Sequence, residues 1–247
     1  MLLALHGLGS DSSALRDYLA GAVPAGVRVF APDLRAHGAD ERLGGPEDFA
    51  LEAMADDVAG ALIRVGDGSP VSIVGVSLGA ALATIIARSG RFPLDRVALV
   101  RPAFTHESLP PNLAVFPLIG RLLGEHKPQR ALAHLRSSGA WRAIAHESLA
   151  HARYLETQVT QPGAAARRIR LTEIPRNALA PSIEPRIPAP TVVLASPRDP
   201  VHPLHVAQHW ADELGARMLV SPARDDGEDA MMRWFQQQLG SFLTGIR

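Results

Sequence analysis

The chain of 247 residues contains no cysteine, which excludes disulfide bonds, thiolate nucleophiles and thiolate metal ligands. It is also almost without lysine, since Lys127 is the only one. Chemistry that uses a lysine as a base, as a Schiff-base former or as a phosphate ligand therefore has a single candidate.

An excess of charge of one sign is missing as well, because 25 basic side chains balance 25 acidic ones. Such a chain has no long-range field to attract nucleic acid or anionic lipid, and we expect neither as a partner. No apolar run approaches the roughly 18 residues of a membrane span. The apolar start at residues 1–5 breaks at His6-Gly7, too early for a signal peptide. We therefore expect a soluble, cytoplasmic protein.

The hydrophobic content of 47% is enough for a single domain with a large core. Short apolar runs alternate with helical patterns, which is typical of a parallel sheet covered on both faces. The pattern predicts a mostly parallel, doubly wound α/β fold of about six strands. The predicted strands are Leu2 to Leu5, Val27 to Ala31, Val71 to Gly75, Val97 to Val100, Thr191 to Ala195 and Arg217 to Val220. The predicted helices are Ser13 to Ala22, Leu51 to Val65, Leu78 to Ser89, Val206 to Leu214 and Asp229 to Leu243.

Residues 105–190 interrupt the alternation with helical stretches, scattered prolines and no convincing strand. We expect a helical cap or lid inserted into a core formed by residues 1–104 and 191–247, with residues 174–190 as the return connection. The apolar residues of the insertion have two interpretations. They pack the insertion onto the core, or some of them line a pocket beneath a lid.

A Gly-x-Ser-x-Gly motif, Gly75 to Gly79, falls where a buried strand meets a helix. A strand that reverses into a helix at one residue strains that residue and leaves no room for side chains two positions to either side. Glycines at both positions remove the collision. Serine is also a good helix N-cap, but an N-cap does not need flanking glycines. The motif therefore predicts that Ser77 is a nucleophile at the carboxyl edge of the sheet.

The first strand ends in Gly7-x-Gly9, and Asp33 follows the second strand, a spacing that imitates a dinucleotide-binding fingerprint. The third glycine position holds Ser12, however, and neither Tyr18 nor Tyr154 has a lysine four residues later. The pattern therefore gives little support to a nucleotide cofactor.

Four segments in this order resemble the α/β-hydrolase superfamily, in particular its small bacterial lid-bearing esterases. They are His6-Gly7-Leu8-Gly9, Asp33-Leu34-Arg35-Ala36-His37-Gly38, Gly75 to Gly79 and Arg198-Asp199-Pro200. The resemblance implies that the backbone N–H groups of Leu8 and Leu78 form an oxyanion hole and that Asp199 is the catalytic acid. It also implies that His6 and His37 are structural hydrogen-bonding residues, and that the family's first two strands are absent.

The resemblance places the catalytic histidine in the loop at residues 221–227, but this loop has none, and no histidine follows His209. Loss of the histidine from subtilisin costs about a millionfold in kcat. Three hypotheses remain open. In the first, another histidine acts as the base, either His202, three residues beyond Asp199, or His106 or His151 from the insertion.

In the second hypothesis, Asp225 or Asp226 takes the histidine's place beside Asp199, and the two carboxylates share a proton. In the third, the scaffold has lost hydrolysis. The sequence thus predicts a serine hydrolase acting on a small apolar ester or related acyl compound, or else a non-hydrolytic ligand-binding protein or pseudoenzyme of the same fold.

We expect no cofactor and no metal. The chain has no HExxH motif. His202, His205 and His209 do follow helix-like intervals, but a proline separates the first two.

Overall fold

A computed structural model describes residues 1–182 and 186–245 of the chain. Its centre is a six-stranded sheet of order β2-β1-β3-β4-β5-β6, in which every neighbouring pair is parallel. The strands are β1 (Leu2–Leu5), β2 (Val29–Phe30), β3 (Val71–Val76), β4 (Leu94–Val100), β5 (Thr191–Ala195) and β6 (Arg217–Val220). The predicted α/β fold is confirmed.

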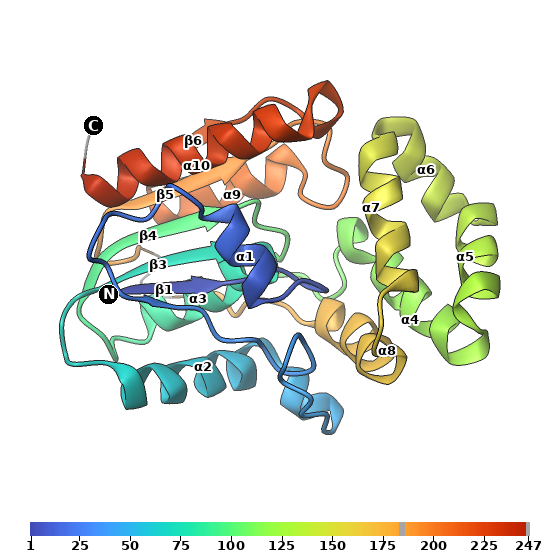
Figure 1. Cartoon of the computed structure of the whole chain (residues 1–247), viewed down its shortest axis with the longest axis horizontal. Coiled ribbons are helices and arrows are strands. Elements are labelled where there is room, and N and C mark those ends of the chain that lie inside the picture. The colour runs from blue at the N-terminus through green and yellow to red at the C-terminus, as the bar shows by residue number, and fades with distance from the viewer. Residues whose placement is uncertain (183–185, 246–247) are drawn as a thin grey trace.

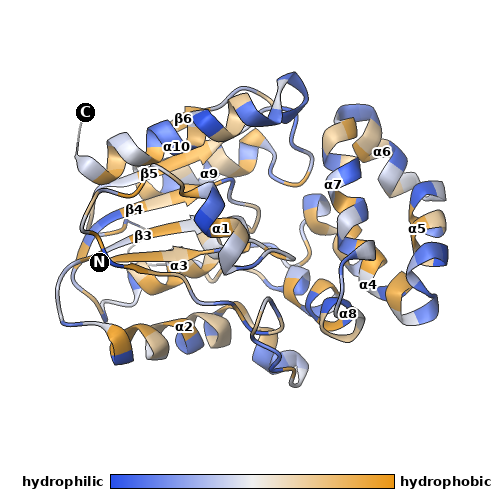
Figure 2. Cartoon of the chain, viewed as in Figure 1, coloured by the Kyte–Doolittle hydropathy of each residue, from blue (hydrophilic) through white to orange (hydrophobic). Residues whose placement is uncertain are grey.

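Helices cover both faces of the sheet (Figure 1). Because alternate residues of a strand point to opposite faces, Leu2 and Ala4 pack with α1 (Ser12–Tyr18) and α10 (Glu228–Thr244). Leu3 and Leu5 pack with the helices of the other face, which are α2 (Leu51–Val65), α3 (Leu78–Arg88) and α9 (Leu204–Leu214). Hydrophobic residues follow the strands, and polar residues concentrate on the outer turns of the helices (Figure 2).

The predicted boundaries fail mainly where elements reach the surface. Strand β2 has two residues instead of the predicted Val27 to Ala31, because this edge of the sheet leaves Val27 and Val29 exposed. Strand β4 begins at Leu94, three residues before the predicted start, because its first residues are only partly buried and lack an apolar pattern. Helix α1 ends at Tyr18, four residues before the predicted Ala22.

Between β4 and β5 the described residues contain helices and no strand. The helices are α4 (Val115–Glu125), α5 (Pro128–Ser137), α6 (Gly139–Glu147), α7 (Leu149–Thr160) and α8 (Ala164–Glu173). They lie beyond the carboxyl ends of the strands (Figure 1). Residues 183–185 of the predicted return connection and residues 246–247 of the predicted core lie outside the described residues. Short 3-10 helices occur at Pro46–Phe49, Pro111–Leu113, Ile174–Arg176 and Arg224–Asp226.

None of the helices within residues 1–182 and 186–245 combines the length and the apolar character needed to cross a membrane.

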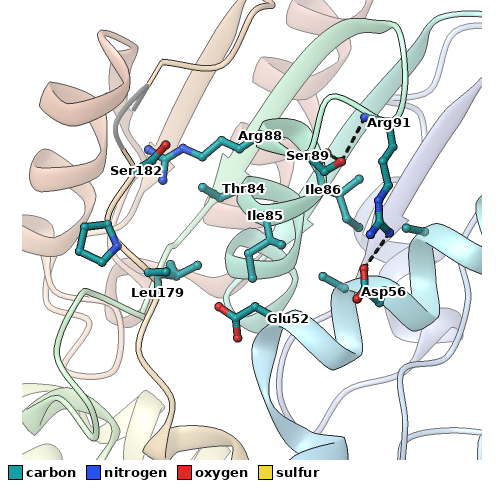
Figure 3. Close-up of a pocket in the computed structure, with 14 residues that line it drawn as sticks. Glu52, Asp56, Thr84, Ile85, Ile86, Arg88, Ser89, Arg91, Leu179 and Ser182 are labelled. Atoms are coloured by element: carbon teal, nitrogen blue, oxygen red, sulfur yellow. Dashed lines mark hydrogen bonds and ion pairs between the residues drawn. The ribbon is translucent and has the colours of Figure 1, made fainter.

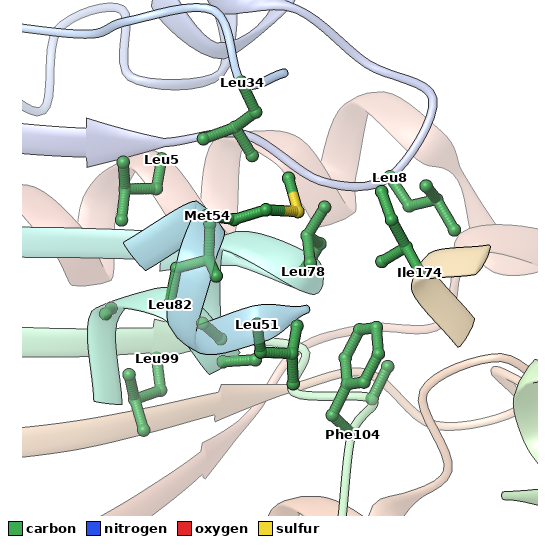
Figure 4. Packing of buried hydrophobic residues seen from close by; sticks show 14 of the residues in the cluster. Leu5, Leu8, Leu34, Leu51, Met54, Leu78, Leu82, Leu99, Phe104 and Ile174 are labelled. Carbon is green, nitrogen blue, oxygen red and sulfur yellow. The ribbon is translucent and has the colours of Figure 1, made fainter. Parts of the chain in front are cut away.

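The apolar core continues from the sheet into the helical segment. Ile174, which follows α8, belongs to the same buried cluster as Leu8, Leu78 and Phe104 (Figure 4). Phe116 of α4 is buried in this cluster too. The helical segment is therefore packed onto the core, as one interpretation of its apolar residues predicted.

The junction between β3 and α3 is too tight for side chains. A Cβ atom at Gly79 would overlap the carbonyl group of Leu5 on β1, and one at Gly75 would overlap the carbonyl group of Gly79. The obstacles are backbone atoms within the sheet and the first turn of α3, which cannot move aside without displacing the elements themselves. The two glycines of the motif thus allow α3 to begin directly after Ser77.

We predict that Gly79→Ala destabilises the protein by at least about 2 kcal/mol, the usual cost of forcing extra atoms into a packed interior. Gly139→Ala is the matched control, because a Cβ atom at Gly139, on the first turn of α6, meets no atom within 4 Å. Urea unfolding of the two variants and the wild type measures the difference. Equal midpoints for all three proteins would contradict this account of the junction.

Candidate active site

Ser77 is held in the strained geometry that the motif predicts. Its backbone has φ 55° and ψ −110°, a positive-φ conformation that serine rarely adopts. Its N–H donates to the carbonyl oxygen of Val100 on β4 at 2.9 Å, which ties the turn to the neighbouring strand. Ser77 therefore lies at the carboxyl edge of the sheet, between β3 and α3.

The loop after β5 brings two further side chains to this serine. Nδ1 of His202 lies 2.9 Å from Oδ2 of Asp199, and Nε2 of His202 lies 2.8 Å from Oγ of Ser77. The other carboxylate oxygen of Asp199 accepts the backbone N–H groups of Val201 and His202 at 3.1 and 3.0 Å. Ser77, His202 and Asp199 thus form one hydrogen-bonded line, and the tight turn that contains Asp199 positions the histidine.

Of the candidate bases, only His202 is brought to Ser77. His106 instead contacts the carbonyl oxygen of Leu179 and the carboxylate of Glu213, at 2.7 and 2.8 Å. The signal for His202 in the sequence was its spacing of three residues from Asp199, which suits a turn closed by the aspartate side chain.

The two aspartates of the second hypothesis are engaged elsewhere. Asp225 accepts hydrogen bonds from the hydroxyl of Ser148 and, at 3.2 Å, from the N–H of Ala150. Asp226 forms an ion pair with Arg198. The place beside Asp199 that this hypothesis gave to a second carboxylate is occupied by the His202 imidazole, so the geometry contradicts it.

His151 of α7 reaches Asp199 from the helical segment. Its Nε2 lies 3.0 Å from Oδ2 of Asp199, and its Nδ1 lies 2.9 Å from the hydroxyl of Ser148, the N-cap of α7. The Ser148 hydroxyl in turn donates to Asp225. His151, considered in the sequence as a base, is therefore placed beside the predicted acid, and two imidazoles flank one carboxylate oxygen.

Burial and the neighbouring side chains determine the protonation states of Asp199 and His202. Burial by itself would raise the pKa of Asp199, but His202, His151 and Arg101 favour the carboxylate and hold its pKa well below the usual value. Burial lowers the pKa of His202 below 6.5, although the charge of Asp199 opposes this shift. Near neutral pH, Asp199 is thus ionised and His202 is neutral, the states required of an orienting acid and a general base.

His6 and His37 support the loops around Ser77 by hydrogen bonds, as predicted. Nε2 of His37 accepts the N–H of Gly9 at 3.1 Å, and Nε2 of His6 accepts the N–H of Leu34 at 3.0 Å. Burial lowers the pKa of both histidines, which keeps them neutral acceptors. They fix the loop that carries Leu8 beside the serine.

The loop from Gly7 to Gly9 packs closely on the nucleophile turn. A Cβ atom at Gly7 would lie 3.3 Å from Cβ of Ser77, so the backbone that leads into Leu8 passes directly beside the serine. Leu78 is the first residue of α3, and its N–H therefore has no acceptor within the helix. Both predicted oxyanion donors thus belong to segments adjoining Ser77.

Asp33, the acid of the dinucleotide-like pattern, supports the same region. Its carboxylate accepts the N–H groups of Ser12 at 2.7 Å and of Ala39 at 2.8 Å. These bonds hold the second-strand loop against the start of α1, and they occupy both carboxylate oxygens.

A cavity of about 250 Å³ opens on Ser77 and His202. Roughly eight water molecules would fill this volume, so it suits a small ligand. Both the core and the helical segment contribute to its walls. The apolar side chains are Leu8, Ala14, Leu15, Val76, Phe116, Leu155, Val201 and Met232, and the polar ones include Tyr18, Arg101, His151, Tyr154, Arg224 and Glu228.

A second cavity, of about 620 Å³, lies between α2, α3 and residues 179–182 (Figure 3). Its walls include Glu52, Ile85 and Leu179, and an ion pair of 2.7 Å between Arg91 and Asp56 crosses one side of it. None of the predicted site residues lines it. Although it is the larger cavity, the side chains that suit nucleophilic chemistry gather in the smaller one.

His106, His209 and Glu213 form the one group of side chains within the described ranges that could hold a metal ion. Their ligand atoms lie within 4.8 Å of one another. Glu213, however, already forms an ion pair of 2.7 Å with Arg88 and a contact of 2.8 Å with His106. The cluster therefore has a structural explanation as an ion-pair network between α3, α9 and the segment after β4.

Comparison with known proteins agrees with the observed fold. A model of the family described as the alpha/beta hydrolase family matches residues 2–239. No curated protein matches the chain.

Similar solved structures include the enol-lactonase from Burkholderia xenovorans LB400, with 21% identity, a TM-score of 0.74 and coverage of 98% of this chain and 90% of that one. An esterase from Exiguobacterium antarcticum has 15% identity, a TM-score of 0.72 and coverage of 98% and 91%. A hydrolase of the same fold from a deep-sea metagenome library, MGS-M2, has 15% identity, a TM-score of 0.74 and coverage of 99% and 88%. At these identities the likeness is one of fold.

We predict that the His202 imidazole titrates below pH 6.5 in the folded protein, because its burial outweighs the field of Asp199. Asp199→Asn removes the charge that favours the imidazolium, so the pKa of His202 falls further. Histidine Cε1–H resonances, assigned with a His202→Gln variant, measure both titrations by NMR. A pKa that rises in Asp199→Asn would contradict the described contact.

Proposed function

Because the chain belongs to the alpha/beta hydrolase family, we propose that it hydrolyses small carboxylic esters through an acyl-enzyme on Ser77. The observation that carries the proposal is the contact of 2.8 Å between Nε2 of His202 and Oγ of Ser77, with Asp199 behind the histidine. Nucleophile and base within hydrogen-bond reach, with the base oriented by a third group, are the parts needed for nucleophilic catalysis by serine.

In the first half of the proposed reaction, neutral His202 takes the proton from the Ser77 hydroxyl while Oγ attacks the ester carbonyl carbon. Asp199 holds Nδ1–H of His202 and stabilises the imidazolium that forms. The carbonyl oxygen becomes an oxyanion, for which the backbone N–H groups of Leu8 and Leu78 are the proposed donors. Two such donors contribute several kcal/mol to the stability of a tetrahedral intermediate.

The intermediate collapses when the carbon–oxygen bond to the leaving group breaks and His202 returns its proton to the departing alcohol. In the second half, His202 takes a proton from water, and the resulting hydroxide attacks the acyl carbon. Ser77 leaves with the proton from His202, and the carboxylic acid is released. The apolar walls of the cavity suit a short acyl chain.

The test of this proposal uses chromogenic 4-nitrophenyl esters of graded chain length. We predict that Ser77→Ala and His202→Ala each lower kcat by at least about a thousandfold, since the loss of either group from subtilisin costs about a millionfold. His205→Ala is the matched control, because His205 is exposed at the start of α9, three residues beyond His202.

Full activity of His202→Ala together with inactivity of Asp225→Asn or Asp226→Asn would restore the shared-carboxylate hypothesis. If the wild type binds ligands in the cavity but hydrolyses no ester, the alternative of a non-hydrolytic ligand-binding protein or pseudoenzyme is favoured.

We further predict that His151 acts as a positioning residue, through Asp199. His151→Ala removes an imidazole that lies 3.0 Å from a buried carboxylate oxygen, so we expect kcat to fall about tenfold. Burial does most to lower the pKa of His202, and His151 acts in the same direction. The acid limb of the kcat/KM profile, where the base must be neutral, therefore moves to higher pH in the variant.

His151→Gln, which keeps a donor, should recover part of kcat, while His146→Ala changes an exposed histidine of the same helical segment and serves as the control. An acid limb that stays in place in His151→Ala would mean that the histidine contributes packing alone.

A further inference from the structure

The cavity that contains Ser77 has an unusual complement of buried basic groups. Arg101 follows β4 and Arg224 follows β6, so the two residues come from distant parts of the sequence to line one small space. The residue Arg224 is only 8% exposed and the side chain of Arg101 only 12%. Guanidinium groups are rarely enclosed in this way unless they meet negative charge.

The protein's own carboxylates balance the positive charges of Arg101 and Arg224 only in part. Arg224 pairs with Glu228 at 2.8 Å, but the side chain of Glu228 is 60% exposed. Arg101 lies 3.5 Å from the carboxylate of Asp199, which already receives His202 and approaches His151. The Nε atoms of Arg101 and Arg224 are buried and have no acceptor in the described part of the chain.

Tyr18 of α1 adds a third donor to the same walls. Its hydroxyl is buried, has no hydrogen-bond partner among the described residues, and lies in the fields of both Arg101 and Arg224. A hydroxyl group enclosed without an acceptor is costly unless a ligand supplies one. Three donors from separate elements thus line one cavity, and the carboxylate among its lining residues, that of Glu228, is largely exposed.

The backbone at Arg101 is also held away from the ordinary conformations. It has φ 47°, in the left-handed region, and its N–H donates to the carbonyl oxygen of Leu194 on β5 at 2.6 Å. A non-glycine residue in this conformation persists only where its surroundings impose it, and such residues cluster at ligand sites. Arg101 is therefore held between β3 and β5 at the carboxyl edge, one residue beyond the carbonyl that fixes Ser77.

The geometry points to a substrate that carries a carboxylate, bound by Arg224, Arg101 and Tyr18 while its ester group lies at Ser77. This inference rests on the proposed hydrolase function and narrows its substrate class from apolar esters to short esters with an anionic end. Guanidinium groups bind carboxylates by charge-assisted hydrogen bonds, and a tyrosine hydroxyl donates to the same oxygens. The apolar walls then accommodate the carbon chain between the two ends.

The experiment compares two esters of one chain length, the mono-4-nitrophenyl ester of glutaric acid and 4-nitrophenyl pentanoate. We expect the wild type to favour the glutarate ester at least tenfold in kcat/KM. Arg224→Gln should lower this ratio about tenfold, because it removes one of the carboxylate's cationic partners. Glu228→Gln should raise the ratio, because it removes the anion that competes for Arg224.

One control and one independent variant separate the effect of charge from an effect on folding. Arg28→Gln removes an exposed arginine that pairs with Asp67 and does not line the cavity, so the ratio should stay at the wild-type value. Glu228 is itself exposed, so its variant tests the inference even if Arg224→Gln does not fold. A wild-type ratio near one, or a ratio that Glu228→Gln lowers, would overturn the inference.

Binding of glutarate to Ser77→Ala, measured by calorimetry, distinguishes this inference from the hydrolase proposal. Saturable binding that Arg224→Gln weakens about tenfold supports the carboxylate site even if the wild type hydrolyses neither ester. Hydrolysis of both esters without preference, and without glutarate binding, would leave the hydrolase proposal standing and contradict the carboxylate site.

Discussion

The carboxylate of Asp199 is the group on which the rest of the site depends. It is fully buried, and it is balanced by the N–H groups of its own turn, by the imidazole of His202, and by the nearby His151 and Arg101. A buried carboxylate without such partners would protonate or destabilise the fold. The need to satisfy this one charge therefore explains why segments after β4 and β5 and helix α7 converge beside Ser77.

This convergence joins two parts of the chain that the sequence separates widely. His151 and Ser148 belong to the helical segment, whereas Asp199 and Asp225 belong to the loops after β5 and β6. Their contacts run from Asp199 through His151 and Ser148 to Asp225. Under the proposed mechanism, the placement of the helical segment is thus coupled to the orientation of the base, so that a shift of α7 acts on Asp199.

The sequence predicted the features that depend on local geometry. The nucleophile turn was predictable because glycines at positions 75 and 79 are required by contacts with their own strand, helix and neighbouring strand. The alternation of apolar runs predicted all six strands, and it misplaced ends mainly where a strand reached the surface, as at Val27 and Leu94. His202 was named as one candidate among several. Its selection needed the turn at Asp199 and the distance to Ser77, which spacing in the sequence does not fix. The roles proposed for Arg101, Arg224 and His151 depend on packing between distant segments. Of these three residues the sequence named only His151, and it named it as a base.

The central claim, that a histidine from the acid's own loop acts as the base, has a direct test in chemical rescue. His202→Gly opens a space for imidazole between Asp199 and Ser77. Added imidazole should restore ester hydrolysis in a saturable manner in this variant and have no such effect in the His202→Gly, Ser77→Ala double variant. Two results would contradict the account. In one, the His202→Gly protein folds and binds ester, but imidazole does not restore hydrolysis. In the other, this protein hydrolyses ester fully without imidazole.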